Sequence, residues 1–101
     1  MSLSEFRYNK KRKHYAYIFK ENKSRLKCIL LSSKPYRKDH MTLKKNIKLH
    51  AHPNPNSDKQ VYMVPIVYND DVGSFDSKVL NWNFHPNDKR KIKRIKKHKR
   101  I

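Results

Sequence analysis

The apolar residues of this chain are gathered in short stretches, and that pattern constrains its fold more than any other feature. Residues 14–20 read HYAYIFK, residues 25–32 read RLKCILLS, and residues 61–68 read VYMVPIVY. The first and third stretches are rich in aromatic and β-branched residues, and the second becomes continuously apolar, as a buried strand does. The polar segment ENKS between the first two is too short for a parallel crossover. We therefore expect an antiparallel hairpin within a mainly β fold.

The other segments predict loops and one further short strand. The regular pattern is lost over residues 33–60, where Pro53 and Pro55 make an exposed loop the expected structure. Pro65 cannot donate to a strand ladder, so the third strand is expected at a sheet edge or a bulge. Residues 79–84 predict another short strand, with both of its aromatic residues on one face.

Positive charge is concentrated at the two ends of the chain. Of the formal net charge of +18, residues 1–13 carry +4, residues 86–101 carry +8 and residues 14–85 carry +6. We expect a basic N-terminal arm over residues 1–13, a small β-rich domain over residues 14–85 and a basic helix or tail over residues 86–101. The predicted fold class is α+β, mainly β, with a small antiparallel sheet and a basic C-terminal helix. The surplus of cations favours a polyanionic partner, with nucleic acid ahead of an anionic membrane surface.

The C-terminal segment has the composition of a helix with a narrow docking face. Asn87 or Asp88 is expected to cap its start, where acidic charge suits the positive end of the helix dipole. Ile92 and Ile95 form its apolar stripe. Its basic residues repel one another until an anion neutralises them. The sequence therefore leaves open a helix ordered by a partner and a solvated tail.

Neither membrane insertion nor secretion is expected. The longest unbroken apolar run covers residues 28–31, far fewer than the roughly 20 residues of a spanning helix. No apolar stretch of signal-peptide length follows the N-terminal charges. Cys28 is the single cysteine, and a lone thiol in a core strand fits a reducing compartment. We expect a cytoplasmic protein without a membrane span, and the sequence does not predict its oligomeric state.

Phosphate contacts are expected from both ends of the chain and from one lysine between them, because Lys and Arg neutralise phosphates whatever the base sequence. The predicted nucleic-acid-binding residues are Lys10, Lys11, Arg12, Lys13, Lys38, Lys89, Arg90, Lys91, Lys93, Arg94, Lys96, Lys97, Lys99 and Arg100. Tyr15, Tyr17 and Phe19 share one face of the first predicted strand. Such a stripe usually packs in the core, and a stacking platform for unpaired bases is the functional alternative.

The chain lacks the motifs of nucleotide-dependent and zinc-dependent chemistry. It has one glycine, whereas a P-loop or a dinucleotide-binding turn needs several. His50 and His52 would face the same way on a strand, yet two imidazoles fall short of the three or four protein ligands of a zinc site. We expect no cofactor and no metal.

Metal-independent RNA cleavage is the catalytic chemistry that this composition suits best. Attack by a 2′-hydroxyl needs a base, a proton donor for the leaving oxygen and cations that stabilise the phosphorane. The candidate catalytic residues are Arg25, Tyr36, Arg37, His40, His50 and His52. The same side chains would also serve a phosphate-binding loop without catalysis, so the sequence leaves open whether the protein is an enzyme.

The stretch RLKCILLS over residues 25–32 resembles the second strand of the MazF/PemK family of toxin endoribonucleases. In that family an arginine opens an apolar strand of a small SH3-like β-barrel and takes part in cutting RNA. The resemblance implies an SH3-like barrel and gives the arginine's role to Arg25. It covers these eight residues, and the family's glycine-bearing entry strand has no counterpart here.

Three functional hypotheses fit this sequence. The first is a small basic RNA-binding protein that acts as a toxin-like endoribonuclease. The second is a noncatalytic RNA- or DNA-binding accessory protein, and the third is a basic protein that pairs with an acidic protein such as an antitoxin. RNA is favoured over DNA as the nucleic-acid partner.

Overall fold

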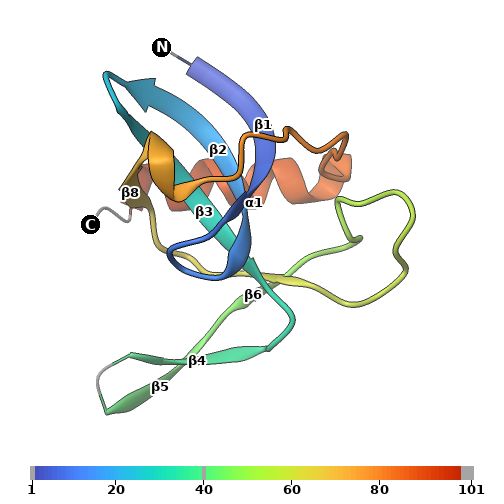
Figure 1. The fold of residues 1–101 in the computed structure, drawn as a ribbon. Coiled ribbons are helices and arrows are strands. Elements are labelled where there is room, and N and C mark those ends of the chain that lie inside the picture. The colour runs from blue at the N-terminus through green and yellow to red at the C-terminus, as the bar shows by residue number, and fades with distance from the viewer. Residues whose placement is uncertain (1, 40, 99–101) are drawn as a thin grey trace.

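The fold is built around an antiparallel meander of three long strands (Figure 1). The computed structural model describes residues 2–39 and 41–98 of the chain. The strands are β1 (Ser2–Asn9), β2 (His14–Asn22) and β3 (Arg25–Ser32). The antiparallel hairpin expected from the sequence is confirmed, because β2 and β3 pair along most of their length.

The far edge of β3 is divided between two short strands. Its first half pairs with β8 (Tyr68–Asp71), and its last two residues pair with β7 (Tyr62–Met63). Strand β7 then pairs with β6 (Ile47–Lys48). The remaining elements are β4 (Tyr36–Asp39), β5 (Thr42–Lys45), the 3-10 turn η1 (Val72–Ser74) and helix α1 (Pro86–His98).

Apolar side chains pack on both faces of the meander. Alternate residues of a strand point to opposite faces, so Ile29 and Leu31 belong to one core and Cys28 and Leu30 to the other. The first core lies under α1 and includes Ile92, Ile95, Phe6, Phe19, Met63 and Phe84. The second core is smaller and is covered by Phe75 and Val64. The central strands are therefore buried on both sides, which explains why β3 reads as a continuous apolar run.

The mainly β fold with one basic C-terminal helix is confirmed. The SH3-like barrel is not, because in the described residues the order of paired strands runs from β1 to β6 and does not close. The strand expected over residues 61–68 divides into β7 and the start of β8. Pro65 interrupts it, since Pro has no N–H, and a tight turn from Ile66 N to Val64 O redirects the chain.

Residues 79–84 do not form the expected strand. They make an isolated bridge from Leu80 to Phe6, and the rings of Trp82 and Phe84 pack on Phe6 at centroid distances of 5.8 and 4.9 Å. Aromatic packing thus holds this segment beside β1 without a hydrogen-bonded ladder.

The described residues near both ends of the chain belong to the folded body. A separate basic arm was expected over residues 1–13, but residues 2–13 supply β1 and the turn into β2. Helix α1 buries Ile92 and Ile95, at 5% and 3% exposure, and so is docked on the first core. Within the described residues, no helix is long and apolar enough to cross a membrane.

Candidate nucleic-acid interface

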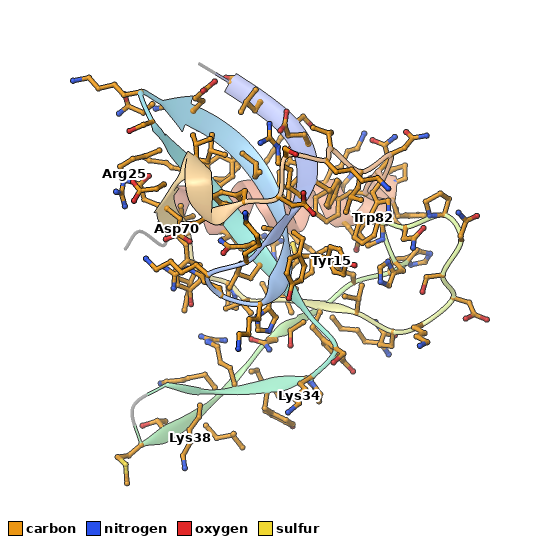
Figure 2. The ribbon with its side chains drawn as sticks, viewed as in Figure 1. Tyr15, Arg25, Lys34, Lys38, Asp70 and Trp82 are labelled. Atoms are coloured by element: carbon orange, nitrogen blue, oxygen red, sulfur yellow. The ribbon has the colours of Figure 1, made fainter. Side chains whose placement is uncertain are left out.

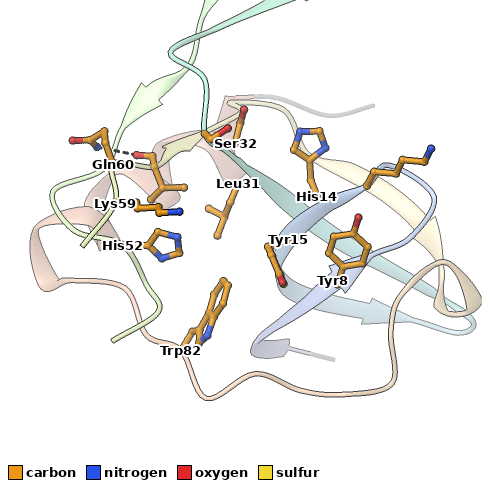
Figure 3. A pocket seen from close by; sticks show the side chains of 12 residues that line it. Tyr8, His14, Tyr15, Leu31, Ser32, His52, Lys59, Gln60 and Trp82 are labelled. Carbon is orange, nitrogen blue, oxygen red and sulfur yellow. Dashed lines mark hydrogen bonds between the residues drawn. The ribbon is translucent and has the colours of Figure 1, made fainter. Parts of the chain in front are cut away.

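A pocket of about 330 Å³ opens where the β1–β2 turn, the end of β3 and the loop before β7 meet (Figure 3). Its ring-bearing lining residues are Tyr8, His14, Tyr15, His52 and Trp82. Tyr8 and Tyr15 lie directly opposite each other on β1 and β2, which brings their rings to 5.1 Å in an edge-on contact. The pairing of β1 with β2 therefore places Tyr8 and Tyr15 side by side in the wall of the pocket.

Trp82 completes the aromatic surface from a distant part of the chain. Its ring lies 4.9 Å from that of Tyr15 and 5.5 Å from that of His52. Tyr15 keeps 45% of its surface exposed, unlike the buried Phe19 on the same strand. Of the three aromatic residues expected to share a face of β2, Tyr15 lines the pocket, whereas Tyr17 and Phe19 pack against the core under α1.

The loop that carries His52 is fixed to the Trp82 segment by backbone bonding. Asn83 N donates to the carbonyl of Pro53 at 3.1 Å, and Pro53 is buried. The Nδ1 atom of His52 accepts a hydrogen bond from Asn54 N at 3.0 Å. Burial lowers the pKa of His52 and so favours the neutral form of the imidazole, whose flat ring lines the pocket.

Cations stand at the rim of the pocket. Lys13 and Lys59 both line it and both are exposed. Lys13 occupies a left-handed backbone conformation, with φ of 59°, in the turn where its N–H bonds to Asn9 O. The described residues that line the pocket include no Asp or Glu. The pocket therefore combines the exposed ring of Tyr15 with two lysines, and no carboxylate among its described lining residues neutralises their charge.

Arg12, expected to contact phosphate, is used within the protein. Its Nε and Nη2 donate to the two carboxylate oxygens of Asp70 at 2.7 and 2.8 Å, and its guanidinium lies 3.9 Å from the centroid of the Tyr68 ring. Asp70 is 1% exposed and also accepts a hydrogen bond from Asn9 Nδ2. Hydrogen bonds from Arg12 hold the pKa of Asp70 at about 2. The neighbouring lysines Lys10, Lys11 and Lys13 remain exposed.

The candidate catalytic residues lie in separate parts of the molecule. Arg25 opens β3 and donates to Asp71 Oδ1 at 2.9 Å (Figure 2). The other end of β3 reaches the pocket at Ser32, roughly 20 Å farther along an extended strand. Arg37 donates to Lys45 O and to Asn46 Oδ1, in the hairpin of β4 and β5. These two arginines are therefore tied to local partners and are not gathered at the pocket.

The candidate histidines and the candidate tyrosine are only partly brought together. His50 and His52 both line a second hollow of about 390 Å³. The His50 ring also packs against the His85 ring in a tilted contact, with a centroid distance of 4.1 Å. Tyr36 is exposed on β4, and His40 lies outside the described residues.

Helix α1 carries its basic residues on the surface away from the core. Lys89, Arg90, Lys93, Arg94 and Lys96 are exposed, whereas Lys91 donates to Asp88 Oδ1 and to Lys48 O. Lys97 belongs to α1, and Lys99 and Arg100 lie outside the described residues.

The helix start differs from the sequence expectation. The expected cap was Asn87 or Asp88, but the His85 ring accepts the hydrogen bond from Asn87 N. The buried Asp88 carboxylate instead accepts the N–H of His50 at 2.8 and 3.0 Å. This contact attaches the loop that precedes His52 to the start of α1.

Sequence reasoning missed Tyr8, Lys59 and Trp82 as members of one site. Trp82 carries the signal that could have found it, because it is the single tryptophan of the chain and stands between two asparagines. In the described ranges, 2–39 and 41–98, no three His, Cys, Asp or Glu side chains converge as a metal-binding group. The chain matches no protein-family model, no curated protein and no solved structure.

Proposed function

We propose that the protein binds single-stranded nucleic acid, with RNA ahead of DNA, and seats an unpaired base in the aromatic pocket. The observation that carries this proposal is the exposed Tyr15 ring beside Trp82, with Lys13 and Lys59 at the rim. Stacking needs an accessible π-face, and the adjacent phosphates need cations. RNA is preferred because proteins read it chiefly through unstacked bases held against aromatic rings.

The charge of the pocket argues against the other common use of clustered aromatic rings. A cage for a quaternary or methylated ammonium group attracts a cation to the ring faces. Here Lys13, Lys59 and the formal net charge of +18 would repel such a ligand. A base linked to a phosphate matches both the rings and the rim.

Fluorescence of Trp82, the single tryptophan, tests this proposal directly. Titration with short unstructured RNA should quench the emission as a base stacks. Tyr15→Ala should weaken binding by about 5- to 100-fold, the range for loss of one base–aromatic stack. Val72→Ala is the control, because Val72 is an apolar residue with 37% exposure that lies outside the pocket. Equal effects of the two substitutions, or no quenching at saturating RNA, would contradict the proposal.

Metal-independent cleavage is the second candidate function, and one observation favours it. His14 and His52 both line the pocket, so two imidazoles stand next to the place proposed for the base (Figure 3). The Nδ1 atoms of both rings are engaged, with Arg12 O and with Asn54 N, which leaves the Nε2 atoms for a substrate. Incubation of the protein with labelled RNA in excess EDTA separates the two functions. Fragments that disappear in His52→Ala would support an endoribonuclease, whereas retarded but intact RNA supports binding alone.

A further inference from the structure

The β4–β5 hairpin stands apart from the rest of the fold. Within the described residues its two strands pair with each other as a separate sheet. Figure 1 shows it extending from the body between the end of β3 and the start of β6. Every residue of β5 is exposed. An isolated two-stranded hairpin is marginally stable in water. We therefore expect a binding partner to stabilise this hairpin.

The base of the hairpin is fixed although its strands lack a core. Asn46 is buried and donates from Nδ2 to Lys34 O, and its backbone N–H bonds to Pro35 O. Arg37 closes the same network by donating to Lys45 O and to Asn46 Oδ1, at 2.8 and 2.9 Å. These bonds set the direction in which the ribbon leaves the body.

The strand register places cations on both faces of the ribbon. Tyr36 pairs with Lys45 and Lys38 with Leu43, so these four residues share one face. Lys44, paired with Arg37, lies on the other face. Residues 34–45 hold five basic residues against one acidic, a net charge of +4. Met41 and Leu43 are 90% and 67% exposed, so the ribbon also offers apolar contact near its tip.

We propose that the β4–β5 hairpin binds the groove of a double-helical nucleic-acid segment next to the unpaired base. A groove has phosphates on both walls, which suits a ribbon with lysines on both faces. A flat anionic membrane would meet one face, and a single strand offers one row of phosphates. The exposed Met41 and Leu43 supply apolar contact to sugars and base edges in the groove.

The position of the hairpin supports a shared ligand, and this inference rests on the proposed function of the pocket. Ser32 and Ser33 line the pocket, and Lys34 follows at once as the start of the hairpin's base (Figure 2). One nucleic-acid molecule can therefore contact both surfaces. The substrate class is a nucleic acid in which an unpaired base adjoins a paired stem.

Two variants of the full-length protein test the hairpin. In the first, residues 38–43 are replaced by an Asn-Gly turn, which joins Arg37 to Lys44 in a short hairpin and keeps the contacts of Asn46. The replacement removes one lysine and one aspartate, so it shortens the arm without changing the formal charge. The second variant is Lys38→Gln with Lys44→Gln. Its matched control is Lys20→Gln with Lys78→Gln, two exposed lysines outside the hairpin.

The probes are an oligouridine tail alone and the same tail joined to a short paired RNA stem, with a DNA stem as a further arm. Wild-type protein should bind the stem with its tail more tightly than the tail alone. Both hairpin variants should lose this advantage, by about tenfold, while their binding of the tail alone stays unchanged. In the lysine variant the slope of log K against log salt for the stem probe should fall by roughly 0.7 to 0.9 per lost contact. The control pair should keep the advantage of the stem. Circular dichroism and urea unfolding establish that each variant is folded.

Several outcomes would overturn the hairpin's role. These are an undiminished preference for the stem in both variants, an equal loss for both probes, or a wild-type protein that does not distinguish the probes. A change from dimer to monomer in the shortened variant would assign the arm to self-association instead. A normal stem preference combined with no effect of Tyr15→Ala would count against the pocket and leave the hairpin standing.

Discussion

Arg12 and Asp70 form a two-pronged ion pair that joins the β1–β2 turn to β8. Both donor–acceptor distances are below 2.9 Å, and the carboxylate is almost fully buried. Asn9 makes the third hydrogen bond to the same carboxylate, and its own Oδ1 accepts the backbone N–H of Arg12. The pair therefore holds in place the turn that carries Lys13 to the rim of the pocket.

Replacement of Asp70 should destabilise the protein far more than replacement of its neighbour. Asp70→Asn leaves Arg12 without its charged partner, so we expect a loss of about 2–4 kcal/mol in the free energy of unfolding. Asp71→Asn is the control, because the Arg25–Asp71 pair is exposed and such pairs contribute less than about 1 kcal/mol. Urea denaturation of the two variants measures the difference. Equal losses in the two variants would mean that the buried Arg12–Asp70 pair stabilises the fold no more than the exposed Arg25–Asp71 pair does.

Acid should weaken the fold through the same carboxylate. The folded pKa of Asp70 is about 2, below the value of about 3.9 for an unfolded chain. Because the folded pKa is lowered, the stabilisation is present above pH 4 and is lost as the pH falls from about 4 to 2. The shift in pKa corresponds to about 2.5 kcal/mol of stabilisation. Unfolding curves at a series of pH values should show wild type and Asp70→Asn converging over that range, and a constant gap between them would contradict the assignment.

Helix α1 should prove necessary for the fold. Ile95→Ala removes a side chain that is 3% exposed in the core under α1, so we expect a cost of about 2–4 kcal/mol. Arg94→Ala, on the exposed side of the same helix, should change the free energy of unfolding by less than about 0.5 kcal/mol. Thermal and urea unfolding report both values. If Ile95→Ala changed the free energy of unfolding as little as Arg94→Ala, the C-terminal segment would instead be a solvated tail.

The Cys28 thiol should be inert in the native protein. It is fully buried, and burial raises its pKa to about 12, so little thiolate is present at pH 8. Reaction with a thiol-specific disulfide reagent should be at least about a hundredfold slower in buffer than in denaturing urea. Rapid labelling of native protein would show that the core around β3 opens readily.

Local pattern predicted the central hairpin well. Residues 14–20 and 25–32 correspond to β2 and β3, because alternation and apolar runs are properties of one strand and its immediate neighbours. The same reasoning failed for the hairpin of β4 and β5. Every residue of β5 is exposed, so its sequence carries no pattern of alternating buried and exposed residues. It also failed for residues 79–84, which are held beside Phe6 by packed rings instead of a ladder.

The sequence by itself determined the mainly β character, the positions of β2 and β3 and the excess of positive charge, and it left the C-terminal segment open between a helix and a solvated tail. Tertiary structure alone decided which cations are free and which aromatic residues meet. Arg12 and Lys13 are neighbours in the chain, yet one is paired with Asp70, 58 residues away, and the other is exposed at the pocket. Tyr15 faces Trp82 because β1 holds both β2 and the 79–84 segment. Contacts of this kind depend on how separate elements pack, and no local periodicity records that packing.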